Sequence, residues 1–331
     1  MKLLKPRALR PGGRLGIIAC STPINAAPDV IDRAYRRLGE LGFQVVEAPN
    51  ARAQLGHTAG SIRERVKALH AFIRDPKIDG ILAFWGGFQG HQLLEYLDYD
   101  LIRRNPKPII GYSDMTSLLV AIHEKAGLVS FNGPAGITFG KPELPEFTRK
   151  SFEEVLVRGL TPLSLSSSSE ISDNLWFLEP DKKMHFQKNP GWKVFRPGKA
   201  EGRLIGGNIG TMLLLAGTDY WPKLKGRIFV IEEDESENSR TLDRFFTQLR
   251  QMGVYDEIAG MIVGRFSSSV KLSPSDSLDM ILDDALRGYR FPVITEIDFG
   301  HTDPLLTLPM GVRARMSTKP LKIELLEAAV S

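Results

Sequence analysis

Pro108-Ile-Ile-Gly-Tyr-Ser-Asp-Met-Thr-Ser-Leu-Leu119 carries an apolar strand candidate straight into a helix candidate, with Ser113 at the corner between them. The strand is expected over residues 108–112 and the helix over residues 115–125. A serine at such a turn projects its hydroxyl at the carboxyl end of a parallel α/β sheet, where open sheets of this kind bind ligands. The stretch therefore predicts a parallel sheet with Ser113 at its ligand-binding edge.

The chain before this stretch repeats the same alternation of strand and helix. Apolar runs of strand length alternate with segments of helical periodicity, which is typical of a parallel sheet covered by helices. Ser61 followed by Glu64 is a capping box, so one helix is expected to begin at Ser61. The other expected elements are strands at 15–20, 43–47 and 80–85 and helices at 30–41, 61–73 and 91–97.

The chain changes character after about residue 160. Residues 161–199 are polar and irregular, which is typical of a linker or of a loop that covers a substrate. This segment contains Trp176 and Trp192, which either hold the loop against a domain surface or stack on a ligand.

The last part of the chain predicts a second, smaller domain that is α/β or rich in strands. We therefore expect an α/β protein with a parallel-sheet domain over 1–160, a linker or substrate loop over 161–200 and a β-rich domain over 201–331. The elements expected in this last domain are strands at 227–231, 261–266, 292–297 and 322–326 and helices at 241–252 and 276–286.

Charge and composition narrow the function classes. The net charge of +4 comes from 43 basic and 39 acidic residues spread along the chain without a dense Lys/Arg block, so nucleic acid is not an expected partner. No signal peptide and no run approaching ~20 apolar residues is visible, so we expect a cytoplasmic protein without a membrane partner. Cys20 is the only cysteine, and neither H-E-x-x-H nor C-x-x-C occurs, so no metal or other cofactor is expected.

The surroundings of Ser113 allow two interpretations. As a nucleophile, Ser113 has backbone donors for an oxyanion nearby: the amide of Asp114 at the helix N-terminus, and those of Gly86 and Gly87 in a glycine-rich turn. Alternatively, Ser113-Asp114 is an ordinary helix N-cap. Met115 also stands where the G-x-S-x-G motif has its second glycine. The local sequence leaves both interpretations open.

A serine nucleophile needs a base and an acid that orients the base. His301 follows the strand expected at 292–297, in a loop from which a side chain can reach across a cleft. Glu232 is the first polar residue after the run at 227–231 and can fix the imidazole tautomer. The remaining histidines lie in helical patterns (His70, His123), in polar loops (His57, His185) or at a helix start (His91).

A set of motifs in a fixed order points to one family. They are Gly86-Gly87, Leu97-Asp-Tyr-Asp100, Asn105-Pro-Lys107, Gly111-Tyr-Ser-Asp-Met-Thr116, Gly206-Gly-Asn208, Ile231-Glu-Glu233, Gly300-His301 and Thr307-Leu-Pro-Met-Gly311. Together they span nearly the whole chain and resemble the LD-carboxypeptidase family of serine peptidases.

The resemblance implies a catalytic triad of Ser113, Glu232 and His301. It implies an oxyanion hole made by the amides of Asp114 and Gly87. It also implies a homodimer whose subunits have a Rossmann-like N-terminal domain and a β-rich C-terminal domain, with the site between the domains.

Two branches of the resembled family differ in substrate. One removes the terminal D-alanine of L,D-linked murein tetrapeptides, and the other, like the microcin C self-immunity peptidases, cleaves an aminoacyl group from a modified nucleotide. This sequence is more similar to the second branch, in which a loop tryptophan stacks on the nucleobase. Trp176 matches that residue better than Trp192, and Gly86 and Asn208 are further expected substrate-binding residues.

Two rival functions remain in view. An α/β-hydrolase esterase shares the chain order of serine, acid and histidine. A non-catalytic protein that binds a peptide or nucleotide would use Ser113 only as a helix cap.

Overall fold

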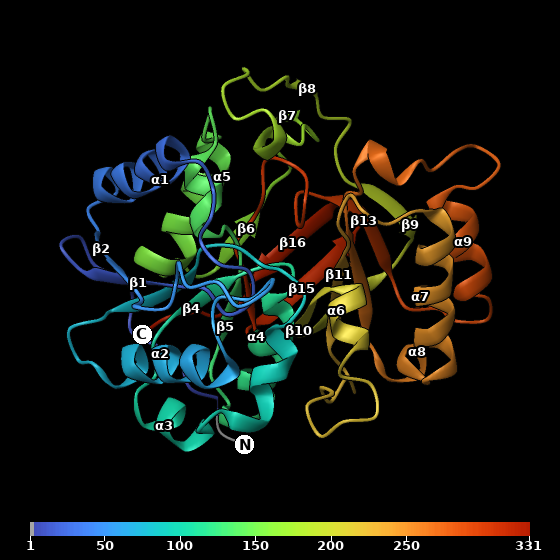
Figure 1. Ribbon diagram of the computed structural model, residues 1–331. Helices are drawn as coiled ribbons and strands as arrows, with labels where there is room; N and C mark the ends of the chain where they lie inside the picture. The colour runs from blue at the N-terminus through green and yellow to red at the C-terminus, as the bar shows by residue number, and fades with distance from the viewer. Residues whose placement is uncertain (1–2) are drawn as a thin grey trace.

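The computed structural model describes residues 3–331, which form two main sheets with helices around them (Figure 1). One sheet has six strands, mostly from the first half of the chain, and the other has eight. A two-stranded ribbon of β7 (Glu170–Ile171) and β8 (Gln187–Lys188) lies above their junction in Figure 1. Buried apolar side chains form one continuous core through both halves. The α/β fold class is confirmed.

The six-stranded sheet has the order β14-β5-β4-β3-β1-β2. Its strands run parallel except β14 (Leu308–Met310), which returns from the end of the chain and pairs antiparallel with β5. Parallel neighbours require crossover connections, and the alternation of helices and strands supplies them. The other strands are β1 (Arg14–Ile18), β2 (Gln44–Glu47), β3 (Gly80–Ala83), β4 (Ile109–Gly111) and β5 (Ser130–Asn132).

Helices form around this sheet largely where the periodicity predicts them. The capping box at the start of α2 is present, since the Ser61 amide donates to Glu64 Oε2 at 2.8 Å and the Glu64 amide donates to Ser61 Oγ at 3.3 Å. The expected helix at 91–97 is instead the 3₁₀-helix η1 (Gly90–Tyr96), a form common in short connections. The remaining elements are α1 (Pro28–Glu40), α2 (Ile62–Arg74), α3 (Tyr99–Arg104), α4 (Met115–Ala126), the 3₁₀-helix η2 (Gly136–Gly140), α5 (Glu146–Phe152) and the short π-helix η3 (Glu153–Val157).

The eight-stranded sheet has the order β6-β16-β15-β10-β11-β12-β13-β9. Its four central strands, β10 to β13, are parallel, and the flanking strands are antiparallel. The strands are β6 (Leu163–Leu165), β9 (Lys193–Arg196), β10 (Lys199–Asn208), β11 (Ile228–Glu232), β12 (Gly260–Gly264), β13 (Val293–Ile297), β15 (Arg313–Thr318) and β16 (Leu321–Leu325). The helical elements of this part are η4 (Trp176–Leu178), α6 (Ile209–Leu213), α7 (Ser239–Gln251), α8 (Val254–Glu257), η5 (Ser268–Val270) and α9 (Leu278–Ala285).

The two halves touch where β10 ends against α4. A Cβ atom on Gly207 would overlap the Thr116 side chain and lie 2.8 Å from Asn132 Nδ2. Gly207 also has a φ of +148°, a conformation that favours glycine. Only a glycine therefore allows this close approach, which brings the carboxyl end of β11 near the Ser113 corner.

Candidate active site

Ser113 lies on a strained turn between β4 and α4. Its φ is +62°, which costs a residue with a side chain about 1–2 kcal/mol. Neither Ser113 nor Asp114 caps α4 with its side chain, so the helix-cap interpretation of this pair is wrong. The Asp114 carboxylate instead accepts a hydrogen bond from the Gly90 amide at 2.7 Å. Strain of this kind is concentrated at functional sites.

The glycine-rich turn after β3 lies directly against this corner. A Cβ atom on Gly86 would lie 3.0 Å from Ser113 Oγ and 3.2 Å from the Asp114 amide nitrogen. Gly87 has a φ of +142°, and a Cβ there would overlap Ser21 Oγ. Gly86 therefore allows the turn to pack closely against Ser113, and Gly87 allows the same turn to pack against Ser21.

His301 and Glu232 form a buried pair beside the same corner. His301 Nδ1 lies 2.6 Å from Glu232 Oε2, and Glu232 is completely buried. The glycine at position 300 leaves room for this contact, because a Cβ atom on Gly300 would overlap Glu232 Oε2. With Nδ1 donating to Glu232, the free Nε2 of His301 remains available to accept a proton.

The charge of Glu232 governs the ionisation of His301. Burial by itself lowers the pKa of His301, but attraction to the Glu232 carboxylate and the hydrogen bond to it outweigh burial and raise the pKa to about 9. The Tyr112 ring packs against the imidazole at a centroid distance of 4.9 Å and restricts its orientation.

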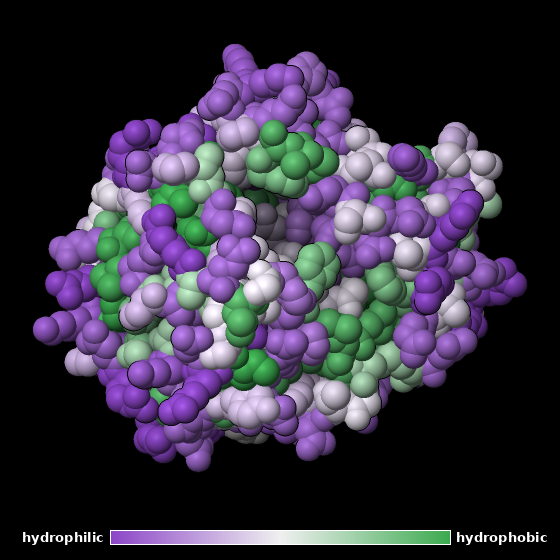
Figure 2. Space-filling view, in the orientation of Figure 1, coloured by the Kyte–Doolittle hydropathy of each residue, from purple (hydrophilic) through white to green (hydrophobic). Residues whose placement is uncertain are grey.

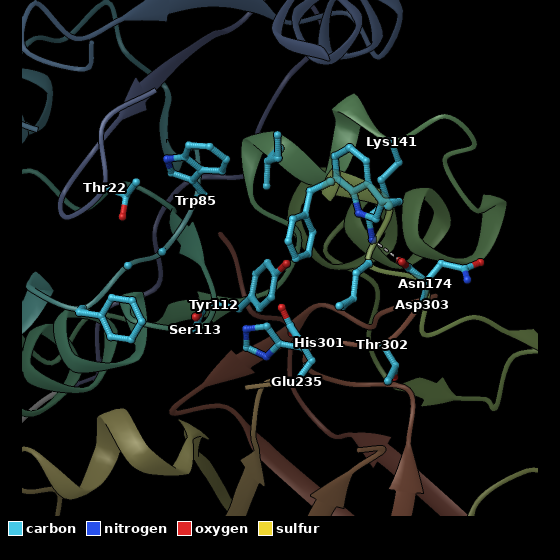
Figure 3. Close-up of a pocket in the computed structure, with 18 residues that line it drawn as sticks. Thr22, Trp85, Tyr112, Ser113, Lys141, Asn174, Glu235, His301, Thr302 and Asp303 are labelled. Carbon is cyan, nitrogen blue, oxygen red and sulfur yellow. Dashed lines mark hydrogen bonds and ion pairs between the residues drawn. The ribbon is translucent and has the colours of Figure 1, made fainter. Parts of the chain in front are cut away.

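Ser113 and His301 line one cavity of about 370 Å³ between the two halves. Figure 2 shows a hollow at this position, bordered above by apolar side chains over η4. Figure 3 shows the lining side chains converging from both halves. The lining residues are Thr22, Trp85, Gly86, Gly87, Phe88, Tyr112, Ser113, Ile137, Lys141, Asn174, Leu175, Trp176, Phe177, Glu235, Gly300, His301, Thr302 and Asp303.

Two family models match the chain. The LD-carboxypeptidase N-terminal domain matches residues 15–133, and the LD-carboxypeptidase C-terminal domain matches residues 201–316. The chain belongs to the LD-carboxypeptidase family. As a member of this family of serine peptidases it is a serine carboxypeptidase, and the resemblance seen in the sequence motifs is confirmed.

Relatives of this LD-carboxypeptidase extend over almost the full length of the chain. A probable murein peptide carboxypeptidase of Bacillus subtilis is 32% identical over 99% of this chain and 95% of its own length. An MccF-like protein from Bacillus anthracis is 34% identical, with a TM-score of 0.93 over 98% of this chain and 99% of its own. The microcin C7 self-immunity protein MccF of Escherichia coli, in complex with aspartyl sulfamoyl adenosine, is 32% identical, with a TM-score of 0.91 over 99% of this chain and 100% of its own.

Lys141 and Asp303 form an ion pair in the wall of the cavity (Figure 3). Both side chains are almost fully buried, with exposed fractions of 6% and 5%. The Lys141 ammonium also lies 5.9 Å from the centre of the Trp176 ring. Trp176 is itself only 7% exposed, so it forms part of the wall and faces the cavity with a small part of its surface.

A buried carboxylate holds the loop that contains the second tryptophan. Asp298 accepts hydrogen bonds from Trp192 Nε1 at 2.8 Å and from Ser168 Oγ at 2.6 Å, and it is paired with Arg265 at 3.1 Å. Trp192 therefore holds the loop against Asp298, which directly follows β13 and lies three residues before His301. It does not line the cavity.

Asn208, an expected substrate-binding residue, has both ends of its amide occupied within the protein. Its Oδ1 accepts from the Thr211 amide at 2.9 Å and caps α6, and its Nδ2 donates to Glu233 Oε1 at 2.5 Å. Burial, followed by repulsion from Glu232, raises the pKa of Glu233 to about 7. Asn208 is absent from the cavity lining, so the structure supports a structural role for its side chain.

Replacing Asn208 with alanine is expected to lower the free energy of unfolding by about 2 kcal/mol, because a helix cap and a partner of a buried carboxylate are lost together. The Michaelis constant is expected to stay within about twofold. Denaturant unfolding and steady-state kinetics measure the two effects. Unchanged stability with a raised Michaelis constant would instead identify Asn208 as a substrate contact. Asn208→Asp is the matched control, since it keeps the cap but places a second acid beside Glu233.

The tertiary structure adds residues to the site that no motif suggests. Lys141, Asp303 and Glu235 bring charge to the cavity, and Phe88 and Phe177 bring exposed aromatic surface, with exposed fractions of 74% and 47%. In the sequence these residues have no distinguishing spacing. Among residues 3–331, no group of three or more His, Cys, Asp or Glu side chains is arranged to hold a metal ion, and no helix is long and apolar enough to cross a membrane.

Proposed function

We propose that this carboxypeptidase hydrolyses an amide bond through a Ser113, His301 and Glu232 triad and an acyl-enzyme. The observation that carries the proposal is the arrangement of Ser113, on a strained turn, in one cavity with a histidine whose other ring nitrogen is held by a buried glutamate. This is the arrangement of nucleophile, base and orienting acid that acyl transfer requires.

The proposed reaction begins with proton transfer. His301 Nε2 accepts the proton of Ser113 Oγ while that oxygen attacks the scissile carbonyl, and Glu232 stabilises the imidazolium that forms. The tetrahedral intermediate collapses when the imidazolium protonates the leaving amine and the amide C–N bond breaks. A water molecule, deprotonated by His301, then attacks the ester of Ser113 and releases the acid and the free serine.

The backbone amides near Ser113 are proposed to stabilise the oxyanion. The amide of Asp114 lies directly before the first residue of α4, and Gly86 lies beside Ser113 Oγ, with Gly87 next to it in the same turn. Two hydrogen bonds hold the turn in place. The Asp114 carboxylate accepts one from the Gly90 amide, and Ser21 Oγ accepts the other from the Phe88 amide at 2.9 Å. Preorganised donors of this kind are usually the largest single contribution to acyl-transfer catalysis.

The proposed substrates are aminoacyl-nucleotide analogues. Support comes from the similarity to MccF, whose structures include complexes with aspartyl sulfamoyl adenosine and glutamyl sulfamoyl guanosine. Trp85, Phe88, Trp176 and Phe177 also give the cavity aromatic surface on which a base can stack, worth about 1–3 kcal/mol per base. Trp176 is the residue we assign first to this stacking, through the small part of its surface that lines the cavity.

Murein tetrapeptide cleavage is the second candidate function. The Bacillus subtilis murein peptide carboxypeptidase is as similar in sequence, at 32% identity, as MccF is. Sequence identity therefore does not separate the two substrates.

A mass-spectrometric cleavage assay that offers an L,D-linked murein tetrapeptide and aspartyl sulfamoyl adenosine side by side tests the proposal. We expect cleavage of the adenosine compound, and Trp176→Ala is expected to raise its Michaelis constant about tenfold through lost stacking. Cleavage of the tetrapeptide alone would contradict the proposed substrates and support murein tetrapeptide cleavage instead. Binding without cleavage of either compound would favour a non-catalytic binding protein.

The proposed enzyme acts in the cytoplasm as a homodimer, with the site between a domain at 1–160 and a domain at 201–331 and with residues 161–200 as the substrate loop. The family resemblance of the sequence motifs supports the dimer. Light scattering of the purified chain at micromolar concentration measures the assembly directly, and a mass of one subunit would contradict it.

A further inference from the structure

The charged groups that line the cavity are not all balanced. Lys141 is paired with Asp303 in the wall, and His301 is bonded to Glu232. Glu235 also lines the cavity, and within the described residues its carboxylate has no hydrogen-bond or ion-pair partner. Glu235 is therefore an uncompensated negative charge in the cavity wall.

Glu235 is held in position by the backbone around it. It lies three residues after Glu232, in the turn that leads from β11 to α7, and its carbonyl oxygen accepts a hydrogen bond from Ser269 Oγ at 3.2 Å. Its half-buried side chain lies beside His301 and below Tyr112 in Figure 3. The carboxylate thus lies on the same side of the cavity as the reacting groups.

An unpaired carboxylate in a partly dehydrated cavity favours a cationic partner. The attraction between opposite charges grows as water is excluded, and an anion at the same place would be repelled. An aminoacyl group carries an ammonium on the carbon next to the scissile carbonyl, so that ammonium enters the site close to Ser113 and His301.

We propose that Glu235 is a specificity residue that binds the free ammonium group of the acyl part of the substrate. This proposal rests on the proposed function and adds the chemical class that the acyl side must have. It predicts that the enzyme selects acyl groups with a free amine over the same groups with a blocked amine. Glu235 adds this selectivity without taking part in bond making or breaking.

The test is calorimetric binding to Ser113→Ala protein, so that the ligands stay intact. The ligands are alanyl sulfamoyl adenosine and its N-acetyl derivative, which lacks the positive charge. Adding Glu235→Gln is expected to weaken binding of the free amine by about tenfold, as expected for a hydrogen bond between charged groups. Binding of the N-acetyl derivative is expected to change less than about twofold.

Asp234→Asn is the matched control in the same background. Asp234 is the neighbouring acid, and like Glu235 it raises the pKa of His301. Its carboxylate, however, accepts a hydrogen bond from the Ser236 amide at 2.7 Å, and Asp234 does not line the cavity. It is expected to leave the ratio of the two affinities unchanged. An equal effect of Glu235→Gln on both ligands, an equal effect of Asp234→Asn, or no binding of either ligand to the Ser113→Ala protein would each overturn the proposal.

Hydrolysis of both ligands by the unaltered enzyme is measured in parallel. Turnover without charge selectivity would overturn the role of Glu235 and leave the proposed function standing. Absence of turnover would overturn the proposed function, while the binding ratios would still decide whether Glu235 recognises the amine.

Discussion

Ser113→Ala protein is expected to lose activity by about four orders of magnitude or more in kcat, because the variant lacks the oxygen that attacks the scissile carbonyl. The Michaelis constant is expected to change little, since the residues that shape the cavity remain. The measurement is single-turnover cleavage of the preferred substrate, followed by mass spectrometry. A trapped acyl-enzyme on Ser113 in the unaltered protein would support the same assignment.

Stability is the control for this variant. Alanine keeps the strained φ of +62°, so the free energy of unfolding of Ser113→Ala should lie within about 0.5 kcal/mol of the original protein. Ser113→Gly should be equally inactive but more stable by about 1 kcal/mol, because glycine adopts this conformation without strain. Residual turnover near the original rate in either variant would remove Ser113 from the mechanism.

Glu232→Gln is expected to have the second-largest effect, about a thousandfold loss in kcat, because an amide can hold His301 in the wrong tautomer and cannot stabilise the imidazolium. The carboxylate is completely buried and 2.6 Å from Nδ1, so no solvent group can substitute for it. Glu233→Gln is a useful comparison, since Glu233 is the adjacent buried acid but bonds to Asn208 and the Gly210 amide. It is expected to retain most of the activity.

The pH dependence of kcat/KM provides an independent check on the Glu232 to His301 pair. A base must be neutral to accept a proton, so a His301 pKa of about 9 predicts that kcat/KM rises with pH until about pH 9. In Glu232→Gln the attraction to Glu232 is lost while burial remains, so the His301 pKa falls and the rising limb is expected to move to lower pH. If the rising part of the kcat/KM profile stayed at the same pH in Glu232→Gln, a group other than His301 would control it.

The same pair links stability to pH. Because folding raises the pKa of His301 above its ordinary value of 6.5, its stabilisation is complete below about pH 6.5 and disappears as pH rises through about 9. The difference amounts to roughly 3 kcal/mol for a shift of this size. Urea unfolding at pH 6 and pH 10 is expected to show this loss in the original protein and a smaller one in Glu232→Gln. An equal loss in both would assign it to other groups.

Much of the fold could be predicted because its signals are local. The strands at β1, β3 and β4, the capping box before α2, and the helices α4 and α7 arise from apolar periodicity and from contacts between residues three or four apart. The antiparallel return of β14 to the first sheet was not predictable in this way. It depends on a pairing with β5 across more than half of the chain.

The residues of the candidate site likewise include some that local sequence suggested and one, Asn208, whose contacts only the tertiary structure revealed. Ser113, Gly87, Glu232 and His301 lie at strand ends or tight turns, and the fold brings such positions together, so local sequence suggested each of them. Asn208 followed the same rule, but its amide is used within the protein by Thr211 and Glu233. Whether a polar side chain faces a ligand or a neighbouring residue depends on contacts that the local sequence does not encode.

The sequence by itself determined the α/β class, the strand-to-helix corner at Ser113 and, through its motifs, membership of the LD-carboxypeptidase family. Only the tertiary structure decided that Trp192 holds the loop by a hydrogen bond to Asp298, that Lys141 is neutralised by Asp303, and that the Glu235 carboxylate lines the cavity without a partner among residues 3–331. The reason is physical: periodicity and turns act over a few residues, whereas charge pairing and burial depend on segments that meet only after the chain has folded.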